Sequence, residues 1–271
     1  MNGASREALA AARERLDALT DNTSVDAGRL ADELAAVTAL LDREVSLRRV
    51  LTDPAQAGEA KAELAQRLLG GQVGGETVDL LAGMVRSRWS QSRDLVDALE
   101  ELANTADLTA AQKAGTLDDV EDELFRFGRI VASSTGLRAA LTDRAATTSA
   151  KSELLRSLLG GRAKATTERL VTRLVTVPRG RSLESGLESL SKLAAERRQR
   201  LVAVVTTAVP LSDRQKQRLG AALGKLYGHT MHLNIDVDPE VVGGIRVQVG
   251  DEVINGSLAD RIEDAGRRLA S

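Results

Sequence analysis

Two stretches, LRRVLTD at residues 47–53 and LRAALTD at residues 137–143, follow one pattern and lie 90 positions apart. The agreement continues at the same offset, where KAELAQRLLGG at 61–71 returns as KSELLRSLLGG at 151–161. Identity in separate blocks at one offset indicates an internal duplication, and a repeat of this kind decides the fold before any single motif does.

Each copy is predicted to be a run of amphipathic helices. Apolar residues recur at helical spacing at Leu30, Leu34, Val37 and Leu41, and again at Leu117, Val120, Leu124, Phe127 and Val131. Asp53 and Pro54 predict a helix N-cap followed by a proline at the first helical position. The Gly-Gly pairs at 70–71 and 160–161 are expected where helices end.

One segment matches both copies. The triplet Asp-Glu-Leu at 32–34 returns at 122–124 in the same register, whereas residues 92–106 have two possible partners. At the plain offset they align with the opening helix, near residues 5–20, and with a one-residue gap they align with the last helix of the second copy, near 183–195. The two helical bundles are therefore expected either to share this helix or to abut through it.

The pattern changes after Arg200. A β-branched run at 201–209 predicts a strand. Ser212 with Gln215 predicts a capping box, which opens a helix that carries Leu219, Leu223 and Leu226 on one face and stops at Gly228. Alternating apolar residues predict further strands at 231–237 and 245–249. A two-residue turn at Gly250-Asp251 leads into a short last strand at 252–254. A final helix is predicted at 258–269.

These patterns predict a mainly α protein: a tandem, duplicated helical bundle followed by a small C-terminal α/β domain. The expected division is an extra N-terminal helical repeat at 1–91, a helical bundle at 92–200 and the α/β domain at 201–271.

The composition excludes several classes of function. The chain has 271 residues, a net charge of −2, 1% aromatic residues and no cysteine. These values speak against stacking of nucleic-acid bases, thiolate metal sites and cysteine catalysis. The absence of an apolar run of about 18 residues, and of a signal-peptide pattern, predicts a cytoplasmic protein.

Candidate chemical sites are weak. His229 and His232 have a spacing that suits a metal on a helix, but they stand at the entry to a predicted strand. Asp236 and Asp238 would be a solvated residue and a turn residue. The glycine-rich stretches do not match a phosphate-binding loop. We therefore predict no catalytic residue, no metal and no cofactor.

Arginines cluster at Arg197, Arg198 and Arg200, with Arg179 and Arg181 upstream. Such a cluster is most often a solvated helix end, and nucleic-acid binding is the less favoured explanation. The only tryptophan, Trp89, fits either a partner anchor or a core residue.

The tail carries a recognisable motif. DPEVVGGIRVQVGD at 238–251, followed by INGS at 254–257, strongly resembles the C-terminal motif of the delta subunits of bacterial F-type ATP synthases. AVPLS at 208–212 also resembles that family. The signature positions are Asp238, Pro239, Gly243, Gly244, Gly250, Asp251, Gly256 and Ser257.

The resemblance covers roughly residues 92–271 and has departures. Asn255 stands where the family commonly has Asp, and Glu168-Arg169 replaces an Asn-Phe pair. Residues 1–91 are additional, which is similar to the extended delta subunits of high-GC Gram-positive bacteria.

The resemblance implies a non-catalytic stator subunit on the cytoplasmic face of the cell membrane, held there only through the complex. Its helical bundle would grip the N-terminal helix of an alpha subunit of the catalytic head, with the beta subunit as a further contact, and its tail would engage the b subunit of the peripheral stalk. In the family the alpha-binding groove lies between the first and fifth helices of the bundle. The candidate lining residues are Leu95, Leu99, Leu102, Leu170, Val171 and Leu174.

Two other classes remain open from the residues alone. A tandem helical nucleic-acid-binding or regulatory protein predicts a clustered basic face and salt-dependent retention. A small enzyme predicts converging titratable residues in a cleft. Neither accounts for the C-terminal motif.

Overall fold

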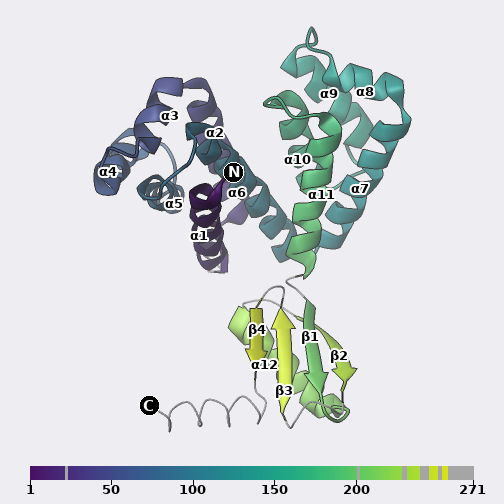
Figure 1. Ribbon diagram of the computed structural model, residues 1–271. Coiled ribbons are helices and arrows are strands. Elements are labelled where there is room, and N and C mark those ends of the chain that lie inside the picture. Colours follow the sequence, from purple (N-terminus) through teal and green to yellow (C-terminus); the bar gives the residue numbers. More distant parts are fainter. Residues whose placement is uncertain (22–23, 200–201, 228–230, 239–243, 250–251, 256–271) are drawn as a thin grey trace. The chain divides into compact units, whose positions relative to one another are not determined.

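A computed structural model describes residues 1–21, 24–199, 202–227, 231–238, 244–249 and 252–255. Contacts divide the chain into two compact units, Met1–Ala194 and Ala195–Ser271 (Figure 1). The first unit is helical and the second contains a β-sheet, which confirms the predicted fold class. Within the described residues, no helix is both long and apolar enough to cross a membrane.

The duplication is present in the structure with its register intact. Four helices of the first copy have counterparts of the same length exactly one repeat later in the chain. The pairs are α2 (Ala27–Arg43) with α7 (Leu117–Ser133), α3 (Val45–Thr52) with α8 (Thr135–Thr142), α4 (Gly58–Leu69) with α9 (Thr148–Leu159), and α5 (Gly75–Arg86) with α10 (Ala165–Thr176). The remaining helices of this region are α1 (Gly3–Asp21), α6 (Ser92–Lys113) and α11 (Leu183–Gln199).

The same polar tie joins the second and fifth helices in both copies. In the first copy the Glu33 carboxylate accepts hydrogen bonds from the Gly74 backbone N–H at 2.9 Å and the Thr77 hydroxyl at 2.5 Å. In the second copy Glu123 accepts from the Lys164 N–H at 2.9 Å and the Thr167 hydroxyl at 2.5 Å. A carboxylate that satisfies the free N–H groups at a helix start explains why this glutamate recurs.

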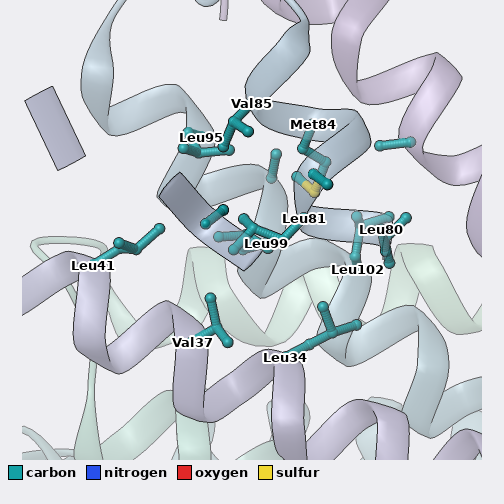
Figure 2. Packing of buried hydrophobic residues seen from close by; sticks show 14 of the residues in the cluster. Leu34, Val37, Leu41, Leu80, Leu81, Met84, Val85, Leu95, Leu99 and Leu102 are labelled. Atoms are coloured by element: carbon teal, nitrogen blue, oxygen red, sulfur yellow. The ribbon is translucent and has the colours of Figure 1, made fainter. Parts of the chain in front are cut away.

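Helix α6 packs against helices of both copies. It contacts α1, α2 and α3 of the first copy and α7 and α10 of the second. Its apolar residues Leu95, Leu99 and Leu102 lie in the core of the first copy, beside Leu81 and Val85 (Figure 2). The last helix of one copy is thus also the first helix of the next, which is the shared arrangement among the two that the repeat allowed.

The amphipathic faces predicted for residues 30–41 and 117–131 are confirmed, since every apolar residue named for them is buried. The helix ends at the Gly-Gly pairs are confirmed as well. α4 and α9 stop just before them, and Gly71 and Gly161 have φ values of 79° and 70°. Glycine adopts this left-handed conformation without the penalty that a Cβ brings.

The prediction that Asp53 and Pro54 begin a helix is wrong. Asp53 ends α3 instead, with an extended backbone at φ −62° and ψ 119°, and Asp143 ends α8 in nearly the same conformation although Arg144 rather than a proline follows it. Its carboxylate accepts a hydrogen bond from the Ala55 N–H at 2.9 Å, as Asp143 does from Ala145 at 2.8 Å. This local turn delays the next helix to Gly58.

The second unit contains a four-stranded mixed sheet in the order β2-β1-β3-β4. β1 (Val202–Thr207) pairs in parallel with β2 (His232–Val237) and antiparallel with β3 (Ile245–Val249), which pairs antiparallel with β4 (Glu252–Asn255). Helix α12 (Asp213–Tyr227) forms the crossover that the parallel pair requires. The predicted strands are therefore confirmed.

Helix α12 begins with the predicted capping box, in which the Gln215 side chain accepts from the Ser212 N–H at 2.9 Å. Its buried face differs from the prediction. Leu223 is buried in the sheet core, but Leu226 is 66% exposed and Tyr227 packs on the core instead. The predicted turn at 250–251 and helix at 258–269 lie outside the described residues.

We predict that Glu33→Ala lowers the free energy of unfolding by about 2 kcal/mol, because a carboxylate that accepts two hydrogen bonds is removed from the start of α5. Urea unfolding followed by the fluorescence of Trp89, the only tryptophan, measures the first copy. Glu63→Ala, which removes an exposed glutamate of α4, is the matched control and is expected to change little. Equal losses in both variants would contradict the role given to Glu33.

A second prediction concerns Tyr227, whose pKa is raised to about 12 by burial and by its hydrogen bond to Glu252 at 2.9 Å. Because the folded-state pKa exceeds the ordinary value of 10.0, the associated stabilisation is fully present below that pH and is lost as pH rises through 12. Tyr227 is the only tyrosine, so its ultraviolet titration is unambiguous. We expect a native midpoint well above the midpoint in urea, and Glu252→Gln should lower it; coincident midpoints would contradict the contact.

Candidate partner-binding site

The two faces of α6 have opposite character. One face carries leucines and lies in the core of the first copy, as described above. Another carries Asp97, Glu100, Asn104 and Asp107, which recur at helical spacing and meet the arginines of α10 and of the segment that follows it. The junction between the two copies is therefore apolar on one side of α6 and ionic on the other.

Asp107 is the centre of the ionic side. Its side chain is fully buried, and Oδ1 accepts a hydrogen bond from Arg169 at 2.6 Å. Arg173 brings Nη2 to 3.0 Å from Oδ2 of the same carboxylate and donates from Nη1 to the Asn104 side chain at 2.9 Å. Burial raises the pKa of Asp107, and the two arginines oppose that shift by stabilising the charged form.

Glu100 forms a second ionic centre nearer the start of α6. It pairs with both Arg179 and Arg181, and Arg179 also lies 3.1 Å from Asp97. The Arg179 side chain is 2% exposed, and its backbone has a φ of 47°, which is unusual for a residue other than glycine. The expectation of a solvated arginine cluster is therefore wrong for Arg179, whose side chain is attracted by the buried Glu100 of α6, and for Arg197, which is 7% exposed. Arg181 also pairs with Glu100, but its side chain is 38% exposed.

The arginines of this network have no basic counterparts one repeat earlier, although Asp107 has an acidic one in Asp17. One repeat earlier, Glu100 corresponds to Ala10, Arg173 to Gly83 and Arg169 to Asp79. The sequence does contain a signal, since Glu100 and Asp107 are seven apart on one helix, while Arg169 and Arg173 are four apart on another and Arg179 and Arg181 follow it. The sequence does not show that α6 packs against α10, and this packing determines which charged side chains form ion pairs.

The six residues predicted to line a groove are all buried. Leu95, Leu99 and Leu102 belong to the core of the first copy. Leu170, Val171 and Leu174 are buried on α10 and do not belong to that core. The structure thus places the two sets in different surroundings, and their role in holding a partner helix stays a prediction.

Helix α11 covers part of the α10 face. A Cβ at Gly186 of α11 would overlap the side chain of Leu174, so the two helices are in close contact there. Glycine at 186 is what permits this approach.

Of the signature residues in the tail, the structure describes Asp238 and Gly244. The Asp238 N–H donates to the Thr207 carbonyl at 2.9 Å and so extends the pairing of β1 with β2. Gly244 has a φ of 108° just before β3. The other six signature residues, Pro239, Gly243, Gly250, Asp251, Gly256 and Ser257, lie outside the described part of the chain.

Trp89 is a core residue. It is 7% exposed, and its indole N–H donates to the Met84 carbonyl at 2.8 Å. As for metal sites, no group of three potential ligands converges among the described residues.

The structure thus consists of a duplicated helical unit with a shared helix and a small module with a mixed sheet. Residues 105–269 match the family model described as ATP synthase delta (OSCP) subunit. An ATP synthase subunit delta from Streptomyces coelicolor is 84% identical over 271 residues, covering 100% of this chain and 99% of the relative. Its counterpart from Thermobifida fusca is 49% identical over 270 residues, with 100% of each chain covered.

The chain belongs to the ATP synthase delta (OSCP) subunit family. Members of this family are non-catalytic structural subunits, and this protein is accordingly a stator subunit of the F-type ATP synthase. The relatives also match over the first helical copy, so the extended form is common to them.

We predict that Asp107→Ala lowers the free energy of unfolding by about 3 kcal/mol, because Arg169 and Arg173 lose their shared buried partner. Urea unfolding followed by circular dichroism measures the change. Asp122→Ala is the matched control, since it breaks an exposed pair with Arg126 and should cost at most about 0.5 kcal/mol. A loss for Asp107→Ala no larger than that of the control would show that the buried ionic centre does not hold α6 to α10.

Proposed function

We propose that the helical unit of this stator subunit holds the N-terminal helix of an alpha subunit, and that the sheet module holds the b subunit. The complex then places the protein at the cytoplasmic face of the cell membrane. Association with the ATP synthase follows from family membership, whereas the assignment of each partner to a unit is our proposal.

The observation that carries this proposal is the way α6 is fixed along its length. The helix has 22 residues and so extends about 33 Å. Leucines anchor one side of it in the first copy, and Asp107 and Glu100 are paired with arginines of the second. A continuous helix fixed on two sides has no flexible joint between the copies.

This rigidity suits a stator. Rotary catalysis applies torque to the catalytic head, and a stator has to resist that torque without chemistry of its own. A partner helix that completes an apolar helical surface supplies a contact that dissociates slowly. The nucleic-acid alternative loses support, since Arg179 and Arg181 are engaged by Glu100.

We further propose that residues 1–91 brace the stalk by adding a contact to the b subunit or the head. Deletion of these residues is a poor test, because it exposes the leucine face of α6 and removes the core that buries it. Substitution of exposed residues of the first copy is a more specific test than deletion. Val50 and Leu68 are 37% and 41% exposed, so Val50→Lys with Leu68→Glu changes the surface of the first copy and leaves its core intact.

Cross-linking of the intact complex tests the assignment of partners. The tagged full-length protein is purified from gently solubilised membranes, treated with a lysine-reactive cross-linker and analysed by mass spectrometry. We expect alpha, beta and b subunits to co-purify, with cross-links from Lys151 and Lys164 to the alpha subunit and from Lys216 and Lys225 to the b subunit. The reverse pattern would contradict the assignment, and recovery of none of these subunits would contradict the stator function.

A further inference from the structure

The second copy contains a cavity of about 720 Å³ that is lined by α8, α9, the end of α10 and the start of α11. Its volume is within the range of sites that take ligands or inserted side chains. Leu141, Leu174 and Val175 form an apolar floor. Around them stand four cationic side chains and one anionic one: Arg138, Arg144, Lys151, Arg181 and Glu184.

The charges at this cavity are only partly balanced within the protein. Arg138 pairs with Glu184 at 3.3 Å, and Arg181 pairs with Glu100. Arg144 and Lys151 have no ionic partner among the described residues. Two cations beside an apolar floor favour an anionic, partly apolar occupant.

In the first copy, the residues equivalent to this floor are buried in a cluster that also contains an aromatic side chain. The floor residues correspond to Leu51, Met84 and Val85, which share a buried cluster with Trp89. The indole N–H of Trp89 bonds to the carbonyl of Met84, the counterpart of Leu174. Trp89 itself corresponds to Arg179, which in the second copy pairs with Glu100 rather than with this floor.

Two lysines at equivalent positions of the two copies also differ in burial. Lys61 of the first copy is 4% exposed, and burial lowers its pKa. Its counterpart Lys151 lines the cavity and is partly exposed. The equivalent lysine is thus buried in one copy and partly exposed beside the cavity in the other.

We infer that this cavity is a docking site for an acidic polypeptide segment of a partner, which inserts one large apolar side chain where the first copy uses its own Trp89. Carboxylates that flank the inserted side chain pair with Arg144 and Lys151. The site goes beyond the proposed function. Of the six predicted groove residues only Leu174 lines this cavity, and assembly of the stator does not depend on whether the cavity binds a peptide.

Fluorescence anisotropy with the full-length protein tests the inference. The probe is a fluorescein-labelled peptide, acetyl-Glu-Glu-Gly-Trp-Gly-Glu-Glu-amide, compared with versions that carry Ala for Trp or Lys for Glu. We expect saturable binding of the first peptide that is at least about tenfold tighter than binding of either altered peptide.

Two matched pairs of variants localise the binding. Arg144→Glu with Lys151→Glu should weaken it at least about tenfold, whereas Arg156→Glu with Arg162→Glu changes the net charge equally on exposed positions outside the cavity and should not. Ala139→Trp, at an exposed lining position, should block the cavity, whereas Ala140→Trp, exposed but outside it, should not. Circular dichroism confirms that each variant folds.

Several results would overturn the inference: no saturable binding, equal binding of the Trp and Ala peptides, or equal losses in the two charge variants. Tighter binding of a labelled 20-nucleotide single-stranded DNA, lost in the Arg144→Glu/Lys151→Glu variant, would also overturn it and assign the cations to nucleic acid.

Discussion

The helical part of this protein depends on the burial of one face of α6. Leu95, Leu99 and Leu102 are all fully buried, and each contributes about 2 kcal/mol relative to an exposed position. The ionic contacts on the other side of the helix contribute less in net terms, because desolvation of the charges offsets their attraction. Apolar burial therefore holds α6 in the first copy, and the ionic contacts select how the second copy meets it.

The difference between its apolar face and its ionic face explains how one helix can pack against both copies. A helix has more than one face. α6 presents leucines to one neighbour (Figure 2) and carboxylates to another. The four arginines that meet this face, Arg169, Arg173, Arg179 and Arg181, have no basic residue at the equivalent positions of the first copy, so these ion pairs are specific to this position in the chain. In a stator subunit, a junction of this kind converts two helical copies into one stiff body.

Loss of symmetry after duplication also accounts for the open corner of the second copy. Where the first copy places Trp89 on its own core, the second has Arg179, which a buried glutamate attracts elsewhere. The same pattern of helices thus accompanies a buried tryptophan in one copy and a cavity in the other. Small changes of side chain at equivalent positions are sufficient for this difference, because the helices that form the corner keep their lengths and spacing.

The sequence by itself determined the duplication, the amphipathic helices, the strands of the tail and the family, because these depend on local spacing and on short motifs. It did not determine that Asp53 ends a helix rather than begins one, since an aspartate before proline fits either role until the surrounding chain path is known. Nor did it determine that Leu226 faces solvent, that Arg179 is a buried ion-pair partner of Glu100, or that Leu95 and its neighbours lie in the core of the first copy. Only the tertiary structure decided these points, because they depend on contacts between residues that are far apart in the chain.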